Sequence, residues 1–101
     1  MMNRKVVVMC GSYRLQQLMQ EEAERLELEC GYAVIPVLAH VLDRELTEAE
    51  KHLLGELHRQ KIDLADAVYV VNPGGYIGDS VRREIEYACE KGKEILYSHT
   101  K

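Results

Sequence analysis

Short apolar runs alternate along this chain with longer segments in which apolar and polar residues recur at helical spacing. Four β-branched, apolar runs are typical of strands: Lys5–Cys10, Tyr32–Leu38, Ala67–Val71 and Glu94–Tyr97. Three segments between them predict helices: about Leu15–Glu29, Thr47–Leu64 and Ser80–Lys91. Strands that alternate with helices predict a parallel sheet with right-handed crossovers. We therefore expect an α/β, three-layer Rossmann-like (flavodoxin-like) fold with a small parallel sheet of four or five strands.

Local signals refine these elements. Thr47-Glu48-Ala49-Glu50 matches a capping box, which explains Glu50 structurally. Gly31 is predicted to end the first helix, and Pro36 places the second strand at an edge or strand end. The segment Ala39–Leu46 lacks periodicity and is predicted to be a loop. The second helix is expected to bury four apolar side chains: Leu53, Leu54, Leu57 and Ile62.

Composition narrows the classes of protein. A chain of 101 residues makes one domain, residues 1–101. With 13 basic and 17 acidic residues, a net charge of −4 and no basic run, nucleic acid is not expected as the main partner. The apolar run before Gly11 is too short for a signal peptide or membrane span, so we expect a cytoplasmic protein without a membrane partner. Three widely spaced cysteines, Cys10, Cys30 and Cys89, are expected to be buried small residues rather than disulfide or zinc ligands.

Two loops are expected to meet at the carboxyl ends of the strands, Gly11–Arg14 and Asn72–Ser80. Backbone amides beside Ser12 and Arg14 suit a phosphate or a sugar hydroxyl. Equally, Gly11-Ser12 is a tight strand-to-helix turn with a capping serine. The sequence leaves both interpretations open.

Glu84 is unusual within the last predicted helix. The face expected to pack on the sheet contains Val81, Ile85, Ala88 and Cys89. Glu84 lies beside that face, either as a partly buried functional group or as a salt-bridged structural one. A capping box does not explain it, because with Ser80 as N-cap the third helical residue is Arg83. A lone carboxylate can attack sugar C1 as a nucleophile. Asp79 is suited to proton transfer or to stabilising the helix N-terminus.

Several other chemistries are not supported. The chain contains neither a G-x-G-x-x-G nor a P-loop motif, and Cys10 to Arg14 is too short for a cysteine-phosphatase loop. The four histidines form no ligand pair at helical spacing, and His58 is expected at the surface or in an interface. We therefore predict no metal and no cofactor.

Three motifs resemble a known family: C-G-S-Y-R at 10–14, A-D-A-V at 65–68, and R-E-I-E-Y-A at 83–88 followed by G-K and a strand. They are similar to the nucleoside 2-deoxyribosyltransferase-like superfamily, which includes 2'-deoxynucleoside 5'-monophosphate N-glycosidases. The resemblance covers most of the chain and points to a small branch of that superfamily. It implies cleavage or transfer at the N-glycosidic bond of nucleosides or their 5'-monophosphates, in a homodimer or higher homo-oligomer.

The resemblance also implies roles for single residues. Glu84 occupies the place of the nucleophile in the family's E-[LI]-G-x-A helix, although Glu86 stands where glycine is usual. Asp79 or Tyr76 is expected to assist. The expected substrate-binding residues follow the first and third strands: Gly11, Ser12, Tyr13, Arg14, Asn72, Gly74, Gly75, Gly78 and Ser80. Arg14 suits a 5'-phosphate, which favours hydrolysis of monophosphates over transfer.

Two alternatives remain open at this point. One is a non-catalytic nucleotide-binding or sensing module on the same fold. The other is a structural dimerisation domain in which Glu84 forms a salt bridge with Arg14 or Arg82. The position of Glu84 relative to a cavity distinguishes these possibilities.

Overall fold

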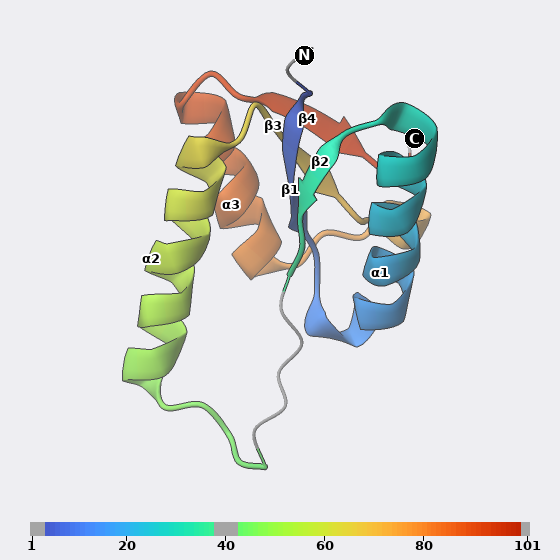
Figure 1. Cartoon of the computed structure of the whole chain (residues 1–101). Helices are drawn as coiled ribbons and strands as arrows, with labels where there is room; N and C mark the ends of the chain where they lie inside the picture. The colour runs from blue at the N-terminus through green and yellow to red at the C-terminus, as the bar shows by residue number, and fades with distance from the viewer. Residues whose placement is uncertain (1–3, 38–42, 100–101) are drawn as a thin grey trace.

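The computed structural model describes residues 4–37 and 43–99 and contains one parallel sheet (Figure 1). Its four strands are β1 (Val6–Cys10), β2 (Ala33–Ile35), β3 (Ala67–Val70) and β4 (Glu94–Tyr97). They lie in the order β2-β1-β3-β4, and every pair is parallel. The predicted α/β three-layer class is thus confirmed, with four strands in the part of the chain described.

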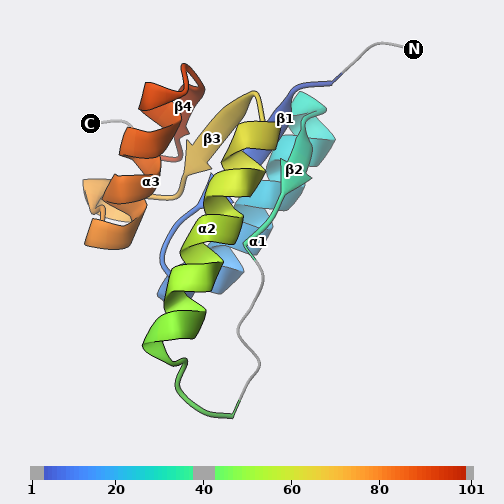
Figure 2. The same ribbon diagram turned by 90° about the vertical axis from the view of Figure 1, so that its left-hand side faces the viewer.

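Helices cover both faces of the sheet (Figures 1 and 2). Helix α1 (Gln16–Arg25) packs on one face, while α2 (Glu48–Leu64) and α3 (Asp79–Glu90) pack on the other. The described residues also contain three short helical turns: η1 (Tyr13–Leu15), η2 (Leu26–Cys30) and η3 (Pro73–Gly75). Gly31 follows η2 with a φ of 70° and ends the first helical segment, as predicted. None of the described helices is long and apolar enough to cross a bilayer.

The core divides into two clusters, one on each face. Side chains of β1 alternate between them, because successive strand residues point to opposite faces. Val7 and Met9 pack toward α1, whereas Val8 and Cys10 pack toward α2 and α3. This double burial explains why the first apolar run is unbroken rather than alternating.

The second strand is shorter than the sequence predicts. It spans Ala33–Ile35 rather than Tyr32–Leu38, and it lies at the edge of the sheet. Pro36 directly follows its last residue and has no amide to continue the ladder. Leu38, and residues 39–42 of the predicted loop, lie outside the described residues.

Helix α2 begins as predicted but buries fewer leucines. The Thr47 hydroxyl accepts from the Glu50 amide at 3.1 Å, and the Glu50 carboxylate accepts from the Thr47 amide at 2.9 Å, which confirms the capping box. Ile62 is buried, but the three leucines expected beside it are 40 to 52% exposed: Leu53, Leu54 and Leu57. The prediction for them was wrong because the N-terminal part of α2 extends past the carboxyl end of the sheet (Figure 1).

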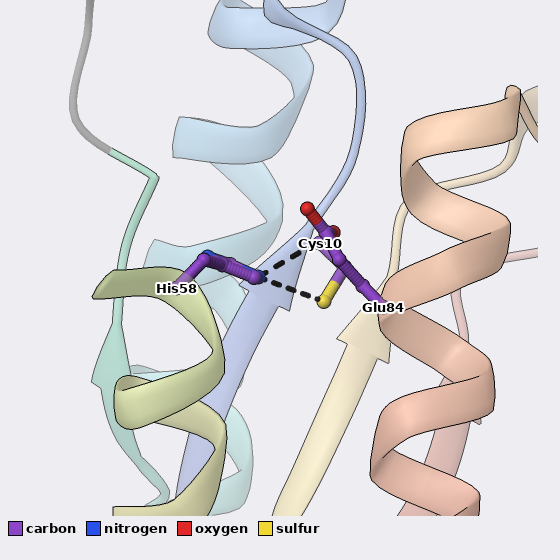
Figure 3. Close-up of side chains that lie close together, drawn as sticks. All are labelled: Cys10, His58 and Glu84. Carbon is purple, nitrogen blue, oxygen red and sulfur yellow. Dashed lines mark hydrogen bonds and ion pairs between the residues drawn. The ribbon is translucent and has the colours of Figure 1, made fainter. Parts of the chain in front are cut away.

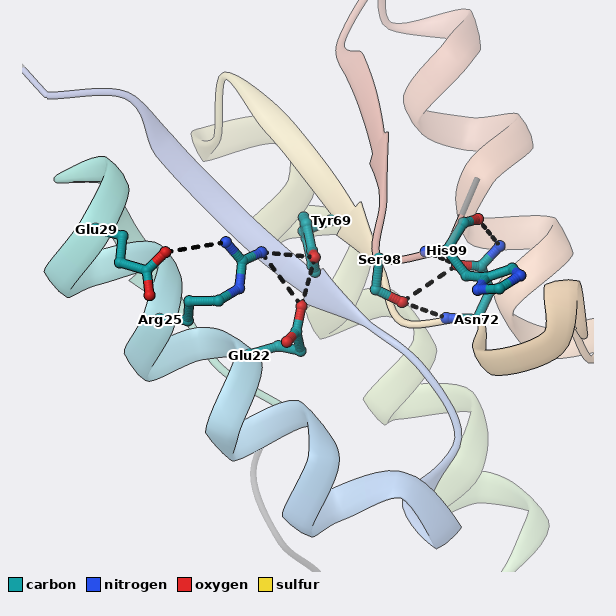
Figure 4. A network of polar contacts seen from close by, with 7 residues as sticks. All are labelled: Glu22, Arg25, Glu29, Tyr69, Asn72, Ser98 and His99. Atoms are coloured by element: carbon teal, nitrogen blue, oxygen red, sulfur yellow. Dashed lines mark hydrogen bonds and ion pairs between the residues drawn. The ribbon is translucent and has the colours of Figure 1, made fainter. Parts of the chain in front are cut away.

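A polar network joins α1 to β3 on the face of the sheet that α1 covers (Figure 4). The Tyr69 hydroxyl donates to the Glu22 carboxylate at 2.6 Å, and Arg25 donates to both groups at 3.1 and 3.3 Å. The Tyr69 hydrogen bond, with help from Arg25, lowers the pKa of Glu22. Because every group is paired, we assign this network a structural role.

Asn72 ties the segment that follows β4 to the loop after β3 (Figure 4). It is 3% exposed, and its side-chain amide donates to the His99 carbonyl at 3.1 Å while its oxygen accepts from the His99 amide at 2.9 Å. The Ser98 hydroxyl accepts from the Asn72 backbone amide at 3.0 Å. One buried side chain therefore satisfies backbone groups on a neighbouring segment.

Asn72→Ala is expected to lower the free energy of unfolding by about 2 kcal/mol, because it removes the buried side chain that pairs with both backbone groups of His99. Urea unfolding followed by circular dichroism measures this change. Gln60→Ala, at an exposed position of α2, serves as the control. Equal midpoints for the two variants would contradict the structural role of Asn72.

Candidate active site

A cleft of about 1220 Å³ opens at the carboxyl ends of β1 and β3. Its walls are the loop after β1, the loop after β3 with the start of α3, and one side of α2 from Glu48 to Lys61. Eight of the predicted site residues line it: Gly11, Ser12, Arg14, Tyr76, Gly78, Asp79, Ser80 and Glu84. The two loops thus face a common space, as the parallel topology requires.

The other predicted site residues have different places. Asn72 is buried in the β4 contact described above and is not part of the cleft lining. Gly74 and Gly75 form the η3 turn with φ values of 66° and 82°, a region that favours glycine. Turn geometry therefore accounts for these two glycines. The Tyr13 backbone belongs to η1, and its side chain lies outside the part of the structure that is described.

Local packing and hydrogen bonds explain the first two residues of the turn after β1, Gly11 and Ser12. The Ser12 hydroxyl accepts from the Arg14 amide at 3.3 Å, and the Ser12 carbonyl accepts from the Leu15 amide at 2.8 Å. A Cβ on Gly11 would lie 2.7 Å from the Met19 sulfur of α1. Ser12 therefore caps the turn, and the same turn lines the cleft.

Helix α3 carries Glu84 in its second turn. The N-cap is Gly78 rather than the expected Ser80, so Asp79 and Ser80 are the first helical residues. Val81 and Ala88 are buried as predicted, but Cys89 is exposed. The Glu84 side chain is 22% exposed, between the packed face and the cleft. Within the described ranges, Glu84 lies at ion-pair distance from His58 and from neither Arg14 nor Arg82.

Glu84 belongs to a cluster that also contains Cys10 and His58 (Figure 3). His58 Nε2 lies 3.4 Å from Cys10 Sγ and 3.4 Å from Glu84 Oε1. Cys10 is the last residue of β1, His58 belongs to α2 and Glu84 to α3. Three elements far apart in sequence therefore place a thiol, an imidazole and a carboxyl group together.

Burial sets the protonation of this cluster. Desolvation raises the pKa of Glu84 to about 7, although the Cys10 hydrogen bond and the Arg83 charge oppose it. Desolvation, with the Lys61 charge, lowers the pKa of His58 to about 4. Burial also raises the pKa of the Cys10 thiol, and the nearby Glu84 charge adds to this effect. At neutral pH the imidazole is neutral, so its contact with Glu84 is not a salt bridge.

The cluster is not arranged as a cysteine-protease triad. In such a relay the nucleophile and the acid contact different ring nitrogens of the histidine. Here both Cys10 and Glu84 contact Nε2. The thiol is also fully buried and protonated, so it is a poor nucleophile. Glu84 is the member of the cluster suited to act on a ligand in the cleft.

The sequence analysis did not identify two of these three residues, Cys10 and His58, as site residues. His58 was expected at the surface or in an interface, but its side chain is only 16% exposed. Its position four residues before the buried Ile62 carried the signal, since that spacing places both on one helix face. Cys10 is buried as expected, whereas Cys30 and Cys89 are exposed, which corrects the prediction for those two.

No protein-family model matches the chain, and no curated protein matches it. The resemblance to the deoxyribosyltransferase-like superfamily therefore depends on the motifs at 10–14, 65–68 and 83–88.

Proposed function

We propose that the protein cleaves or transfers at the N-glycosidic bond of nucleosides or their 5'-monophosphates, with Glu84 as nucleophile. The observation that carries this proposal is the position of Glu84, a largely buried carboxyl group on the wall of an open cleft. Ser12 and Arg14 line the same cleft and offer hydrogen-bond donors to a sugar or phosphate. The family resemblance independently gives Glu84 the same role.

The proposed reaction has two steps. A Glu84 oxygen forms a bond to sugar C1' while the C1'–N bond breaks, and the base leaves with the bonding electrons and takes up a proton. Water, or a second base, then attacks C1' and releases the Glu84 carboxylate. Asp79 and Tyr76 both line the cleft and are the proposed proton donors or acceptors. Attack by water gives hydrolysis, and attack by another base gives transfer.

The environment of Glu84 suits this chemistry. Its carboxylate is poorly solvated, which is the cause of the raised pKa. Positive charge develops at C1' in the oxocarbenium-like transition state, and a desolvated negative charge nearby stabilises it. The stabilisation is therefore larger in the transition state than with the neutral substrate.

The test is release of free base by the wild-type protein from a panel of deoxynucleosides, ribonucleosides and their 5'-monophosphates. Chromatography of the products identifies the substrate class, and addition of a second base separates transfer from hydrolysis. Nucleotide binding in a thermal-shift screen without any base release would favour the alternative, a non-catalytic nucleotide-binding module.

Arg14→Ala is expected to raise the KM for a nucleoside 5'-monophosphate by about 10- to 100-fold, the loss of one charge-assisted phosphate contact. The KM for the matching nucleoside should stay within about twofold, because that substrate has no phosphate. Steady-state kinetics on the two substrates measures the difference. Arg82→Ala, exposed on α3 and not part of the cleft lining, is the matched control. An equal effect on both substrates would exclude a phosphate contact.

The exposed leucines of α2 support a homodimer as the assembly. Leu53, Leu54 and Leu57 form an apolar surface, and two of them also line the cleft. A second copy that covers this surface would remove it from water and complete a cleft wall. We expect sedimentation velocity to give a dimer for the wild type and a folded monomer for Leu53→Glu/Leu57→Glu. A monomeric wild type would contradict this assembly.

The proposed compartment is the cytoplasm, where the three free thiols stay reduced.

A further inference from the structure

We propose that Cys10, His58 and Glu84 form a binding site for a single Zn²⁺-type cation. Each side chain offers one ligand atom, and within the described part of the chain the three atoms all lie within 4.8 Å of one another. Figure 3 shows the side chains converging from β1, α2 and α3 on one point. A sulfur, an imidazole nitrogen and a carboxylate oxygen are all established zinc ligands.

The separations match the edges of a metal tetrahedron. Zinc bonds of about 2.3 Å to sulfur and about 2.0 to 2.2 Å to nitrogen and oxygen place tetrahedral ligand atoms about 3.3 to 3.6 Å apart. Both measured separations, His58 Nε2 to Cys10 Sγ and His58 Nε2 to Glu84 Oε1, are 3.4 Å. A cation between these atoms therefore needs little rearrangement of the two pairs.

The donor set also selects the kind of cation. Thiolate and imidazole ligands favour zinc and similar transition metals over Mg²⁺ and Ca²⁺, which prefer oxygen. Cys10 forms the buried floor of the site, while His58 and Glu84 line the cleft. Three protein ligands leave the fourth position free for a water or another small ligand from the cleft.

The metal site is independent of the proposed function, because it is detected without any substrate. The two are linked through Glu84, which cannot coordinate a cation and attack sugar C1' with the same lone pairs. If both proposals hold, bound zinc inhibits base release and a chelator restores it.

The experiment is an anaerobic titration of the reduced, chelator-treated and untagged protein with Co²⁺, followed by absorption spectroscopy. We expect one equivalent to give the visible bands of a tetrahedral site and a near-ultraviolet thiolate-to-cobalt charge-transfer band. One equivalent of Zn²⁺ should remove both. Glu84→Gln and His58→Gln should weaken Co²⁺ binding by at least about 100-fold. Loss of a group that only hydrogen-bonds to a metal ligand already lowers the affinity by up to about 100-fold, and these two variants remove a ligand itself.

Matched variants identify the sulfur and the imidazole. Cys30→Ser/Cys89→Ser leaves Cys10 as the sole cysteine and should retain the charge-transfer band, a result that does not require a Cys10 variant to fold. Cys10→Ser and Cys10→Ala should lose it. His52→Gln should bind as the wild type does, although His52 also lies 3.0 Å from a glutamate, Glu56. Absence of the band in Cys30→Ser/Cys89→Ser, or unchanged binding by both Glu84→Gln and His58→Gln, would overturn the proposal.

Discussion

Replacement of Glu84 by glutamine is expected to lower kcat/KM for base release by roughly 10³-fold or more, as for the loss of other catalytic nucleophiles. Glutamine has nearly the same shape, so the cleft and its binding groups stay in place. It lacks the negative charge that attacks C1' and stabilises the oxocarbenium-like transition state. The measurement is the rate of base release under kcat/KM conditions on the best substrate of the panel, with both proteins chelator-treated.

Glu86→Gln is the control for this comparison, since Glu86 is exposed on the same helix and does not line the cleft. It should retain wild-type activity. The wild-type pH profile gives a second readout: kcat/KM should fall about tenfold per pH unit below about 7, where Glu84 becomes protonated. Base release by Glu84→Gln at the wild-type rate would assign the chemistry to another group.

Most of the fold could be predicted from the sequence, because the sequence signals for its strands and helices are local. An unbroken, β-branched apolar run such as Val6–Cys10 is typical of a strand buried on both faces, and the Thr47 capping box starts α2 where the sequence places it. Burial along α2 was predicted less well. Helical spacing identifies which leucines share a face, but not that the N-terminal part of α2 extends beyond the sheet (Figure 1). It therefore did not show that Leu53 and Leu57 are exposed.

The candidate site could be predicted only in part, for a related reason. Topology places the loops after β1 and β3 side by side, so the turn at Ser12 and the residues around Asp79 were found from strand order alone. The Cys10–His58 contact depends on how α2 lies across the sheet, at a separation of 48 residues. No local motif records such a contact. Asn72 shows the converse, because its place in a loop gave no indication of the buried bonds to His99.

Glu84→Gln is also expected to stabilise the protein at pH 8 by roughly 3 kcal/mol, because one unit of pKa shift corresponds to about 1.4 kcal/mol. The pKa of Glu84 rises from 4.5 in the unfolded chain to about 7 in the folded one. Between these values the folded state holds a proton that the unfolded state has lost. The wild type therefore loses stability from Glu84 as the pH rises through this range, and above about 7 the full cost remains. Glutamine does not titrate and avoids this loss.

The free energies of unfolding of the wild type and Glu84→Gln are to be compared by urea unfolding at pH 5 and at pH 8, with a chelator present. His58 contributes in the opposite direction, since its pKa is lowered to about 4 and it destabilises the fold as the pH falls below 6.5. It does so in both proteins, so the difference between them isolates Glu84: small at pH 5 and largest at pH 8. Glu86→Gln should show no such difference. A Glu84→Gln protein that is less stable than the wild type at pH 8 would mean that the carboxylate is well stabilised where it lies. A variant that is more stable but inactive would show that the carboxylate on which the proposed chemistry depends also costs folding free energy.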